Sequence, residues 1–345
     1  MMKISTRLDW LEKFPQLPTA TMLYPFTGIF PEPFQDPRAP MARRYQEFMK
    51  QGRNLIELVA PEEADFLLFP FEWYGVTEFT DRDHLLTEFF QLCDRYGKKG
   101  VVSAYGDQHV DLKRFSNAIV LQSNVCGQSL GSRDRVIPSF IEDLRDGRGP
   151  ISGRKRSFLS RFVAKEKPSI SFCGFPGSSP VRAEVLQVFA DSRLVKTKFV
   201  TRQQYYGGAW DKKLGGFDFK KLHQVRRDYI RNLESADYVL CVRGWGNYSA
   251  RFYEALCFGK IPVLIDTDCV FPFEDEIDYD SLWLKIDARD LAKADRLLAE
   301  FDESLDRETF LQRQHHCREA WKTYMSPEGF FGNVDKVIQD RNGKR

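Results

Sequence analysis

The segment from Arg243 to Ile265, RGWGNYSARFYEALCFGKIPVLI, places two glycines, a serine, an arginine and a glutamate between two apolar runs. Val242 ends the first run, and Ile261 begins the second. This order predicts a strand, a loop, a helix over about Ala250 to Phe258 and a second strand, joined by a right-handed crossover. Two parallel strands with a helix between them are the repeating unit of an α/β fold.

The loop and the first turn of this helix carry groups that suit a phosphate. Gly244 and Gly246 let the backbone approach a ligand closely, and we expect Ser249 to be the N-cap of the helix that Gly259 ends. The unpaired N–H groups and the dipole at a helix N-terminus favour an anion. We therefore predict a phosphate-bearing ligand at the carboxyl edge of a parallel sheet.

Arg251 and Glu254 are three residues apart on one face of the predicted helix, whereas Phe252 and Leu256 share a face that can pack on the sheet. A guanidinium can bind diphosphate oxygens, and a carboxylate can accept hydrogen bonds from ribose hydroxyls. Together the two side chains predict a nucleoside diphosphate. The alternative is an exposed Arg251–Glu254 ion pair, which stabilises a helix by only about 0.2–0.5 kcal/mol.

A second candidate phosphate site lies in FCGFPGSSPVRAEVL, which begins at Phe172. Gly174 and Gly177 fall between a predicted strand and a predicted helix, together with two serines, and Arg182 lies in the first turn of that helix. This pattern predicts another anion cradle. The alternative is an ordinary turn in which a serine caps the helix.

Two other interpretations of the first segment involve different ligands. Gly244, Gly246 and Ser249 approximate the GxGxxG pattern, with Asp266 about twenty residues on, as in an NAD-dependent oxidoreductase. We do not favour this interpretation, because the third glycine is missing and NAD enzymes usually carry the pattern in their first βαβ unit. Asp266 and Asp268 form a DxD pair that could hold a divalent metal. Two oxygen ligands alone favour a turn, so we predict no metal site.

The whole chain alternates predicted strands and helices in two halves, which favours parallel sheets. Predicted strands are Ala64–Phe71, Gly100–Tyr105, Ala118–Asn124, Arg135–Ile141, Pro168–Phe175, Leu194–Val200 and Ala236–Val242. We place the domain boundary between Arg145 and Lys167, where eight Lys or Arg face two acidic residues. The expected domains are 1–160 and 168–305, and the helix expected in 306–345 packs back on the N-terminal domain.

Composition excludes several classes of protein. The 345 residues suit two domains of about 150 residues each, and 51 basic against 49 acidic side chains leave no global field for nucleic acid. The sequence has no apolar core of a signal peptide and no run of about 18 apolar residues that could span a membrane. Seven cysteines without a CxxC pair argue against a disulfide framework and a zinc ribbon, and favour a cytoplasmic location.

The segment RGWGNYSARFYEALCFGKIPVLIDTDCVFPFEDEIDY resembles the C-terminal block of the exostosin-like proteins, glycosyltransferase family 47. Shared features are the glycine loop, Ser-x-Arg, Glu-Ala, Gly-x-x-Pro-Val and the acidic–aromatic pair Asp278 and Tyr279. ADFLLFPF, RVIPSF, and SFCGF with Arg182 extend the resemblance over roughly Ala64 to Leu284. The family implies the GT-B architecture, in which two Rossmann-like domains face each other across a cleft.

The resemblance also implies a function. Family members transfer a sugar from a nucleotide sugar, usually a UDP-sugar, with inversion and without an obligatory metal, here to a glycan or glycolipid hydroxyl. Arg251 and Arg182 would contact the diphosphate, and Glu254 would contact the ribose. Animal and plant members generally carry a Golgi membrane anchor, so this chain resembles a soluble, microbial-type member of polysaccharide biosynthesis. We expect a peripheral membrane contact through the basic segment Arg145 to Lys167.

The catalytic base is the least defined part of the resemblance. The family's Asp-His-Phe segment has no clean counterpart, only YGDQHVD, which begins at Tyr105. A base tuned near neutral pH works best, so His109 or a desolvated Asp107 qualifies, and Glu72 is the third candidate. Each of the three could instead be a surface carboxylate or a structural histidine. The alternative function is accordingly a catalytically silent nucleotide- or glycan-binding protein on the same fold.

Overall fold

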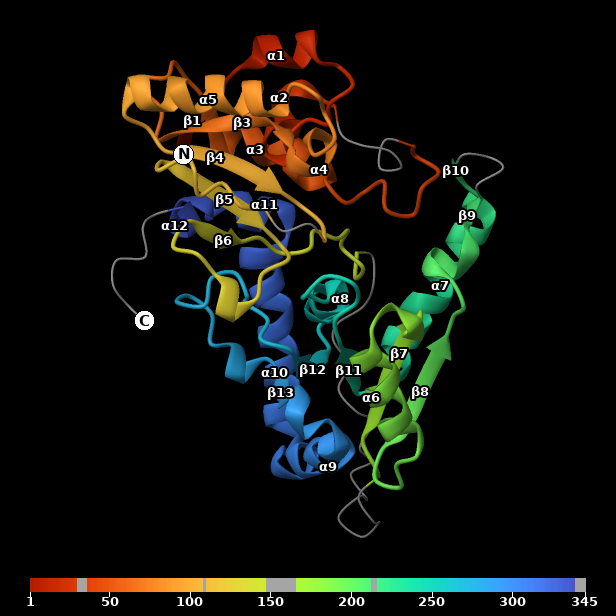
Figure 1. The fold of residues 1–345 in the computed structure, drawn as a ribbon. Coiled ribbons are helices and arrows are strands. Elements are labelled where there is room, and N and C mark those ends of the chain that lie inside the picture. Colours follow the sequence, from red (N-terminus) through yellow and green to blue (C-terminus); the bar gives the residue numbers. More distant parts are fainter. Residues whose placement is uncertain (30–35, 108–109, 147–165, 212–215, 339–345) are drawn as a thin grey trace.

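The computed structural model describes residues 1–29, 36–107, 110–146, 166–211 and 216–338. They form two α/β domains, each built on a parallel sheet (Figure 1). The N-terminal sheet has the strand order β2-β1-β3-β4-β5-β6, and the C-terminal sheet has the order β13-β12-β11-β7-β8. The prediction of two Rossmann-like domains in a GT-B architecture is confirmed.

The N-terminal sheet is covered on both faces, so its central strands are mostly apolar. Its strands are β1 (Met2–Thr6), β2 (Ile56–Leu58), β3 (Phe66–Glu72), β4 (Gly100–Ala104), β5 (Ala118–Gln122) and β6 (Asp134–Val136). Its helices are α1 (Leu8–Lys13), α2 (Tyr24–Thr27), α3 (Gln46–Leu55), α4 (Trp73–Val76) and α5 (Arg82–Tyr96). Every residue of β3, β4 and β5 is buried, which explains why the sequence predicts these three strands.

The C-terminal sheet repeats the same plan. Its strands are β7 (Ser169–Gly174), β8 (Lys196–Thr201), β11 (Tyr238–Cys241), β12 (Ile261–Asp266) and β13 (Leu284–Asp287). Its helices are α6 (Pro180–Ala190), α7 (Phe219–Ser235), α8 (Ala250–Phe258) and α9 (Ala294–Ser304), and a short antiparallel hairpin joins β9 (Trp210–Asp211) to β10 (Gly216–Phe217). Helix α8 has the predicted bounds, and Gly259 ends it in the left-handed conformation at φ +70°.

The order of the strands in each sheet indicates where a ligand would bind. In each sheet the order reverses between the first and third strands in sequence, and ligands of such sheets bind outside the carboxyl ends of the strands at that point. In the C-terminal sheet the reversal lies between β7 and β11. The loops after these two strands are the two glycine-containing segments that the sequence singles out as anion sites.

The end of the chain links the two domains. Three helices take the place of the single one expected: α10 (Arg307–Ala320) packs on α8, one π-helical turn (Trp321–Met325) follows, and then come α11 (Pro327–Gly332) and α12 (Val334–Ile338). Helix α11 packs on α3, where the rings of Phe331 and Phe48 stack at 4.5 Å. Phe330 contacts Phe140 of the N-terminal domain and Phe273 of the C-terminal domain.

The sequence analysis makes two predictions about membranes, one about spanning helices and one about a peripheral contact. Within the described ranges, no helix combines the length and the apolar character that crossing a bilayer requires. The basic segment Arg145 to Lys167 lies mostly outside the described residues, so its membrane contact stays a prediction.

The stacking of α11 on α3 generates a test of how the domains are joined. Phe331→Ala removes a buried ring from the N-terminal core, and we expect a loss of about 3–5 kcal/mol of stability and a Tm several degrees lower. Differential scanning calorimetry measures this. Leu8→Ala is the control, because Leu8 is exposed and its loss should barely change the Tm. Equal Tm values for the two variants would contradict the packing described.

Candidate active site

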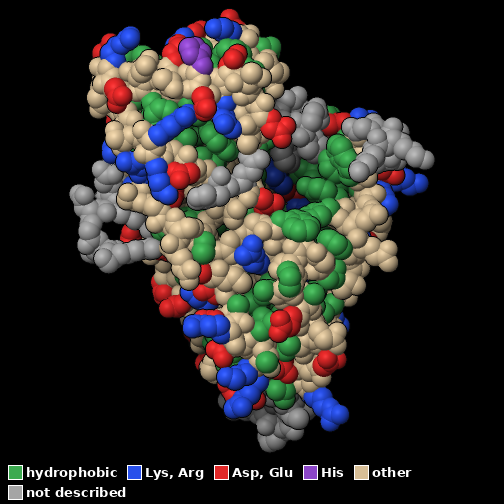
Figure 2. Space-filling view, viewed as in Figure 1, with side chains coloured by type: hydrophobic (Ala, Val, Ile, Leu, Met, Phe, Trp, Pro, Cys, Tyr) green, Lys and Arg blue, Asp and Glu red, His purple; other side chains and the backbone are tan. Residues whose placement is uncertain are grey.

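A pocket of about 310 Å³ lies between the two domains, a size within the range of small-molecule sites. Figure 2 shows this face hollowed below the N-terminal domain, with charged side chains inside and apolar ones along the rim. Among the described residues, its charged lining consists of Arg44, Arg182, Arg202, Arg226, Arg251, Glu142 and Glu254. Arginines outnumber glutamates in this set, so the pocket favours an anionic ligand.

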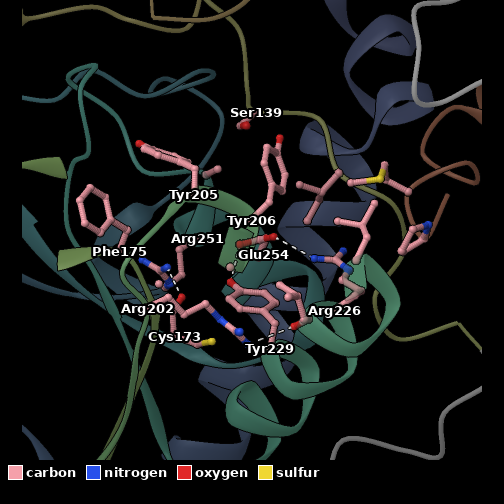
Figure 3. A pocket seen from close by; sticks show the side chains of 18 of the residues that line it. Ser139, Cys173, Phe175, Arg202, Tyr205, Tyr206, Arg226, Tyr229, Arg251 and Glu254 are labelled. Atoms are coloured by element: carbon pink, nitrogen blue, oxygen red, sulfur yellow. Dashed lines mark hydrogen bonds and ion pairs between the residues drawn. The ribbon is translucent and has the colours of Figure 1, made fainter. Parts of the chain in front are cut away.

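Arg251 lies in the first turn of α8, at the edge of the pocket (Figure 3). Its Nη2 donates a hydrogen bond to the carbonyl of Cys173 over 2.6 Å, and its guanidinium lies 4.3 Å from the ring centroid of Phe172. Its Nε is buried without a hydrogen-bond partner. The predicted alternative, an ion pair with Glu254, is not formed. Arg251 is therefore held in place with one donor unused.

Arg182, in the first turn of α6, joins the two loops that meet at this edge of the sheet. Its guanidinium donates to Ser178 Oγ over 2.6 Å and to the carbonyl of Val242 over 2.7 Å. Its Nε, like that of Arg251, is buried without a partner. Burial, and then the charge of Arg251, lower the pKa of Arg182 to about 10. Two cations held together in this way favour an anion beside them.

The glycines of the loop after β11 allow close approaches. A Cβ at Gly244 would lie 3.4 Å from Arg182 Nη2, and a Cβ at Gly246 would lie only 2.6 Å from Asp107 Oδ1. Gly246 is therefore required for the approach of Asp107, which belongs to the N-terminal domain. Gly244 keeps the surface beside the Arg182 guanidinium open.

Ser249 occupies the N-cap position of α8, as expected, but its side chain does not cap the helix. Its backbone carbonyl accepts a hydrogen bond from the amide of Phe252 over 3.0 Å. The hydroxyl is buried and has no hydrogen-bond partner. An unpaired buried hydroxyl costs free energy, and this one lies at the N-terminus of α8 without lining the pocket.

Glu254 lines the pocket one turn further along α8. One carboxylate oxygen accepts a hydrogen bond from the hydroxyl of Tyr229, and the other lies 3.3 Å from Arg226 Nη1. Both partners come from α7. Burial, and then the charge of Glu254, raise the pKa of Tyr229 well above its usual value. The Tyr229 hydroxyl therefore keeps its proton and donates a hydrogen bond to Glu254.

The described candidate bases, Asp107 and Glu72, differ in how deeply they are buried and in their distance from the pocket. Asp107 follows β4 and contacts the glycine loop through Gly246, although it does not line the pocket itself. His109 lies outside the described residues. Glu72 ends β3 in the interior of the N-terminal domain, where it accepts hydrogen bonds from Thr21 and Ser103, and burial raises its pKa. The role of each as a base stays a prediction.

The DxD pair forms a turn, as the sequence predicts. Asp266 lies 3.0 Å from Lys285 Nζ and also accepts a hydrogen bond from the amide of Cys269. Asp268 accepts a hydrogen bond from the amide of Gln128 over 2.8 Å, and this contact crosses to the N-terminal domain. The two carboxylates therefore serve contacts within the protein.

Sequence reasoning missed several residues of the pocket. Arg226 and Tyr229 both lie on α7, and only their spacing of three residues could have shown that they share a face. Arg44 and Glu142 come from loop segments of the N-terminal domain. No local sequence pattern marks these two positions, because they lie beside α7 only as a result of the packing of one domain on the other.

A comparison with models of known protein families identifies one family. The family model of the Exostosin GT47 domain matches residues 114–301. A probable beta-1,4-xylosyltransferase of Arabidopsis thaliana is 34% identical over 98 residues, which are 28% of this chain and 22% of that protein. A probable glucuronosyltransferase of Physcomitrium patens is 31% identical over 98 residues, 28% of this chain and 20% of that protein.

The chain thus covers about a fifth of the length of these curated relatives. Among solved structures, a glycosyltransferase from Rickettsia africae is similar over 99% of both chains, with a TM-score of 0.43 and 10% sequence identity.

The unused donor of Arg251 generates a test with inorganic pyrophosphate. Arg251→Lys keeps the charge but loses the planar fork, so we expect pyrophosphate to bind roughly tenfold more weakly. Isothermal titration calorimetry measures the dissociation constant. Arg296→Lys is the matched control, because Arg296 is exposed on α9 and pairs with Glu300. Unchanged affinity in Arg251→Lys would show that diphosphate oxygens do not use this guanidinium.

Proposed function

This chain belongs to the exostosin GT47 family, and we propose that it is an inverting, metal-independent glycosyltransferase that uses a UDP-sugar. The observation that carries the proposal is the pair of guanidiniums of Arg182 and Arg251, each with a buried and unpaired Nε beside a pocket between the domains. They lie where the strand order of the C-terminal sheet reverses, which is where such sheets bind ligands. A glycan or glycolipid hydroxyl is the proposed acceptor.

The diphosphate of the donor would bind at the N-terminus of α8. Arg182 and Arg251 would each direct Nε at the phosphate oxygens, and the unpaired hydroxyl of Ser249 would supply a further donor. Negative charge builds up on the leaving diphosphate as the glycosidic bond breaks. Donors fixed in advance stabilise that charge, and the loss of one typically costs a factor of about 10² to 10³ in rate.

The nucleoside would bind beside Glu254. Its carboxylate can accept hydrogen bonds from ribose hydroxyls but repels phosphate, so it fixes which end of the donor lies toward the arginines. Tyr229 and Arg226 hold the carboxylate from α7. In this proposal one carboxylate binds the ribose and two arginines bind the phosphates. The ligand must therefore carry both a sugar diol and a diphosphate.

Inversion needs a base on the side of the sugar opposite the leaving group. We assign this role to the segment after β4, with Asp107 or His109 as the base and Glu72 as the third candidate. Asp107 meets Gly246 from across the cleft, beside the loop that carries the leaving-group site. An acceptor hydroxyl held between this segment and the pocket would lose its proton as it attacks the anomeric carbon.

We propose metal independence because arginines predominate among the charged residues of the pocket. The arginines supply positive charge where other glycosyltransferases place a divalent cation between a carboxylate and the diphosphate. Asp266 and Asp268 are engaged by Lys285 and by Gln128. The proposal therefore expects full activity in EDTA.

A cytoplasmic location completes the proposal. All seven cysteines are free, as suits a reducing compartment. We keep the basic segment Arg145 to Lys167 as the candidate for a peripheral membrane contact.

A catalytically silent nucleotide-binding protein is the second candidate function. One observation favours it: of the described residues, the carboxylates that line the pocket are Glu142 and Glu254, and both are held by Arg226. Turnover separates the two functions. Release of UDP from a UDP-sugar by the wild type excludes the silent protein.

The assignment of Glu254 generates the first functional test. UDP should raise the Tm of the wild type, because a ligand at 100 times its Kd stabilises the folded state by about 2.7 kcal/mol. Glu254→Ala should lose most of this gain, since the ribose hydroxyls lose their acceptor. Thermal shift with UDP, GDP, ADP and NAD measures it. A wild type indifferent to every nucleotide would refute the proposal, and a response to NAD alone would favour an oxidoreductase.

The assignment of the base generates the second test. The double variant Asp107→Asn, His109→Asn should release UDP from a UDP-sugar roughly 10² to 10⁴ times more slowly than the wild type. Its UDP affinity should stay the same, because the proposal gives both side chains a contact with the acceptor hydroxyl and none with UDP. Detection of released UDP across a panel of UDP-sugars measures the rate. NMR of the product should show an inverted anomeric configuration, and full activity in the double variant would move the base to Glu72.

A further inference from the structure

Polar side chains from two segments converge on the space above Gly244. A Cβ at Gly244 would lie 3.4 Å from Arg182 Nη2 and 3.5 Å from the hydroxyl oxygen of Tyr205, and Ser178 Oγ would lie 3.8 Å from the same point. Arg182 Nη2 carries two N–H groups, and one of them donates to the carbonyl of Val242. The glycine therefore leaves a space that is lined by a guanidinium and two hydroxyls, all of which can donate hydrogen bonds.

Tyr205 begins a strained turn, Tyr205–Gly208, which follows β8. Tyr206 has φ +48°, in the left-handed region that a bulky side chain seldom adopts. Strain of this kind clusters at ligand sites. The ring of Tyr205 packs edge to face on the ring of Phe175 at 6.1 Å, and the residue is half-exposed at the wall of the pocket. The turn thus fixes the Tyr205 hydroxyl where a ligand can reach it.

The two tyrosines of this turn serve different ends of the pocket. Burial raises the pKa of Tyr205, and the charge of Arg182 acts on it next. Burial also raises the pKa of Tyr206, but the charges that act there include Arg44 and Glu254. Figure 3 shows the two side chains pointing in different directions, with Tyr206 toward the N-terminal domain. Tyr205 therefore lies at the end of the pocket that is farther from Glu254.

We propose that the space above Gly244 binds the second phosphate of a nucleoside diphosphate, and that Tyr205 donates a hydrogen bond to this phosphate. The inference rests on the proposed function, which places the ribose at Glu254. Arg251 lies about one turn before Glu254 on α8, so it meets the phosphate that is joined to the ribose. Gly244 precedes that helix in the loop after β11, so the second phosphate lies beyond Arg251 in the same direction.

This placement gives Tyr205 a part in the reaction. The bond between the anomeric carbon and an oxygen of the second phosphate breaks, and the electron pair stays on that oxygen. The Tyr205 hydroxyl keeps its proton and stabilises the new charge through a hydrogen bond. The sugar on the second phosphate would lie toward Asp107, because Asp107 Oδ1 reaches to 2.6 Å from the Cβ position of Gly246, two residues after Gly244.

The test compares the affinities for UDP and UMP by isothermal titration calorimetry. Gly244→Ala fills the space with a methyl group, which the protein itself accommodates because the nearest atom is 3.4 Å away. Tyr205→Phe removes only the hydroxyl. Each variant should bind UDP at least about tenfold more weakly, since a hydrogen bond to a charged group is lost or blocked. UMP lacks the second phosphate, so both variants should bind it as tightly as the wild type does.

Two matched variants control for the substitutions themselves. Gly332→Ala adds the same methyl group on α11, where its nearest neighbour is Leu55 at 3.6 Å. Tyr96→Phe removes a hydroxyl at the end of α5. Both positions lie outside the pocket, so both variants should bind UDP and UMP as the wild type does. Thermal melts show whether all four variants are folded.

Turnover provides a readout that a merely structural role would not move in the same way. Tyr205→Phe should lower kcat for release of UDP from a UDP-sugar by about 10² or more, with a smaller change in KM. A folded Tyr205→Phe and a folded Gly244→Ala that bind UDP as tightly as the wild type overturn the inference. Equal weakening of UDP and UMP also overturns it, because the second phosphate would then make no difference.

The same data separate this inference from the proposed function. If the wild type binds UDP and releases it from a UDP-sugar, and both variants behave as the wild type does, the inference fails while the proposed function stands. If the wild type binds none of UDP, GDP, CDP and ADP, the proposed function fails, and the inference fails with it.

Discussion

Two guanidinium groups lie at the carboxyl edge of the C-terminal sheet, each with a buried Nε and neither with a carboxylate partner among the described residues. A buried charge is costly unless it is paired and hydrogen-bonded. Arg182 and Arg251 offset part of this cost through backbone carbonyls and the ring of Phe172, and each keeps an unpaired Nε. A bound anion would supply what both side chains lack. The loops after β7 and β11 and the position of α8 all serve to hold this pair of charges.

The relation between the domains is the second constraint, because the pocket exists only where they meet. Asn247 of the glycine loop donates its amide N–H to Asn124 Oδ1 over 2.6 Å and its side-chain amide to the carbonyl of Val125 over 3.2 Å. Helices α10 and α11 form a second connection between the domains, because α10 packs on α8 and α11 packs on α3 through apolar contacts. The glycine loop is thus tied to the N-terminal domain, and a change in the cleft acts directly on the loop beside the arginines.

Much of the C-terminal domain could be predicted, because the sequence patterns that define its helices and strands lie within single elements. The bounds of α8 follow from a polar loop, an apolar face and a terminating glycine, and the shared place of Arg251 and Glu254 in the pocket lining follows from their spacing on that helix. Strand β1 was missed because its sequence, MKIST, mixes polar and apolar residues over only five positions. Ser249 was placed correctly at the helix terminus, but its side chain leaves the backbone uncapped, and spacing cannot reveal this.

The rest of the site depends on tertiary contacts. Glu72 follows a strand in the sequence as Asp107 does, yet the fold buries it among Thr21 and Ser103, and nothing in the local sequence separates these two outcomes. Arg226 pairs with Glu142, which is 84 residues away in the chain. Pairs of this kind form only when two domains close on each other, so a single sequence does not display them.

The central claim is that Arg182, Arg251 and Glu254 form a single nucleoside diphosphate site. A crystal structure of the protein with UDP tests it most directly. The account predicts diphosphate oxygens within hydrogen-bond distance of Nε of both Arg182 and Arg251, and ribose hydroxyls on the carboxylate of Glu254. UDP bound elsewhere, or bound in this pocket with its phosphates turned away from both guanidiniums, would contradict it.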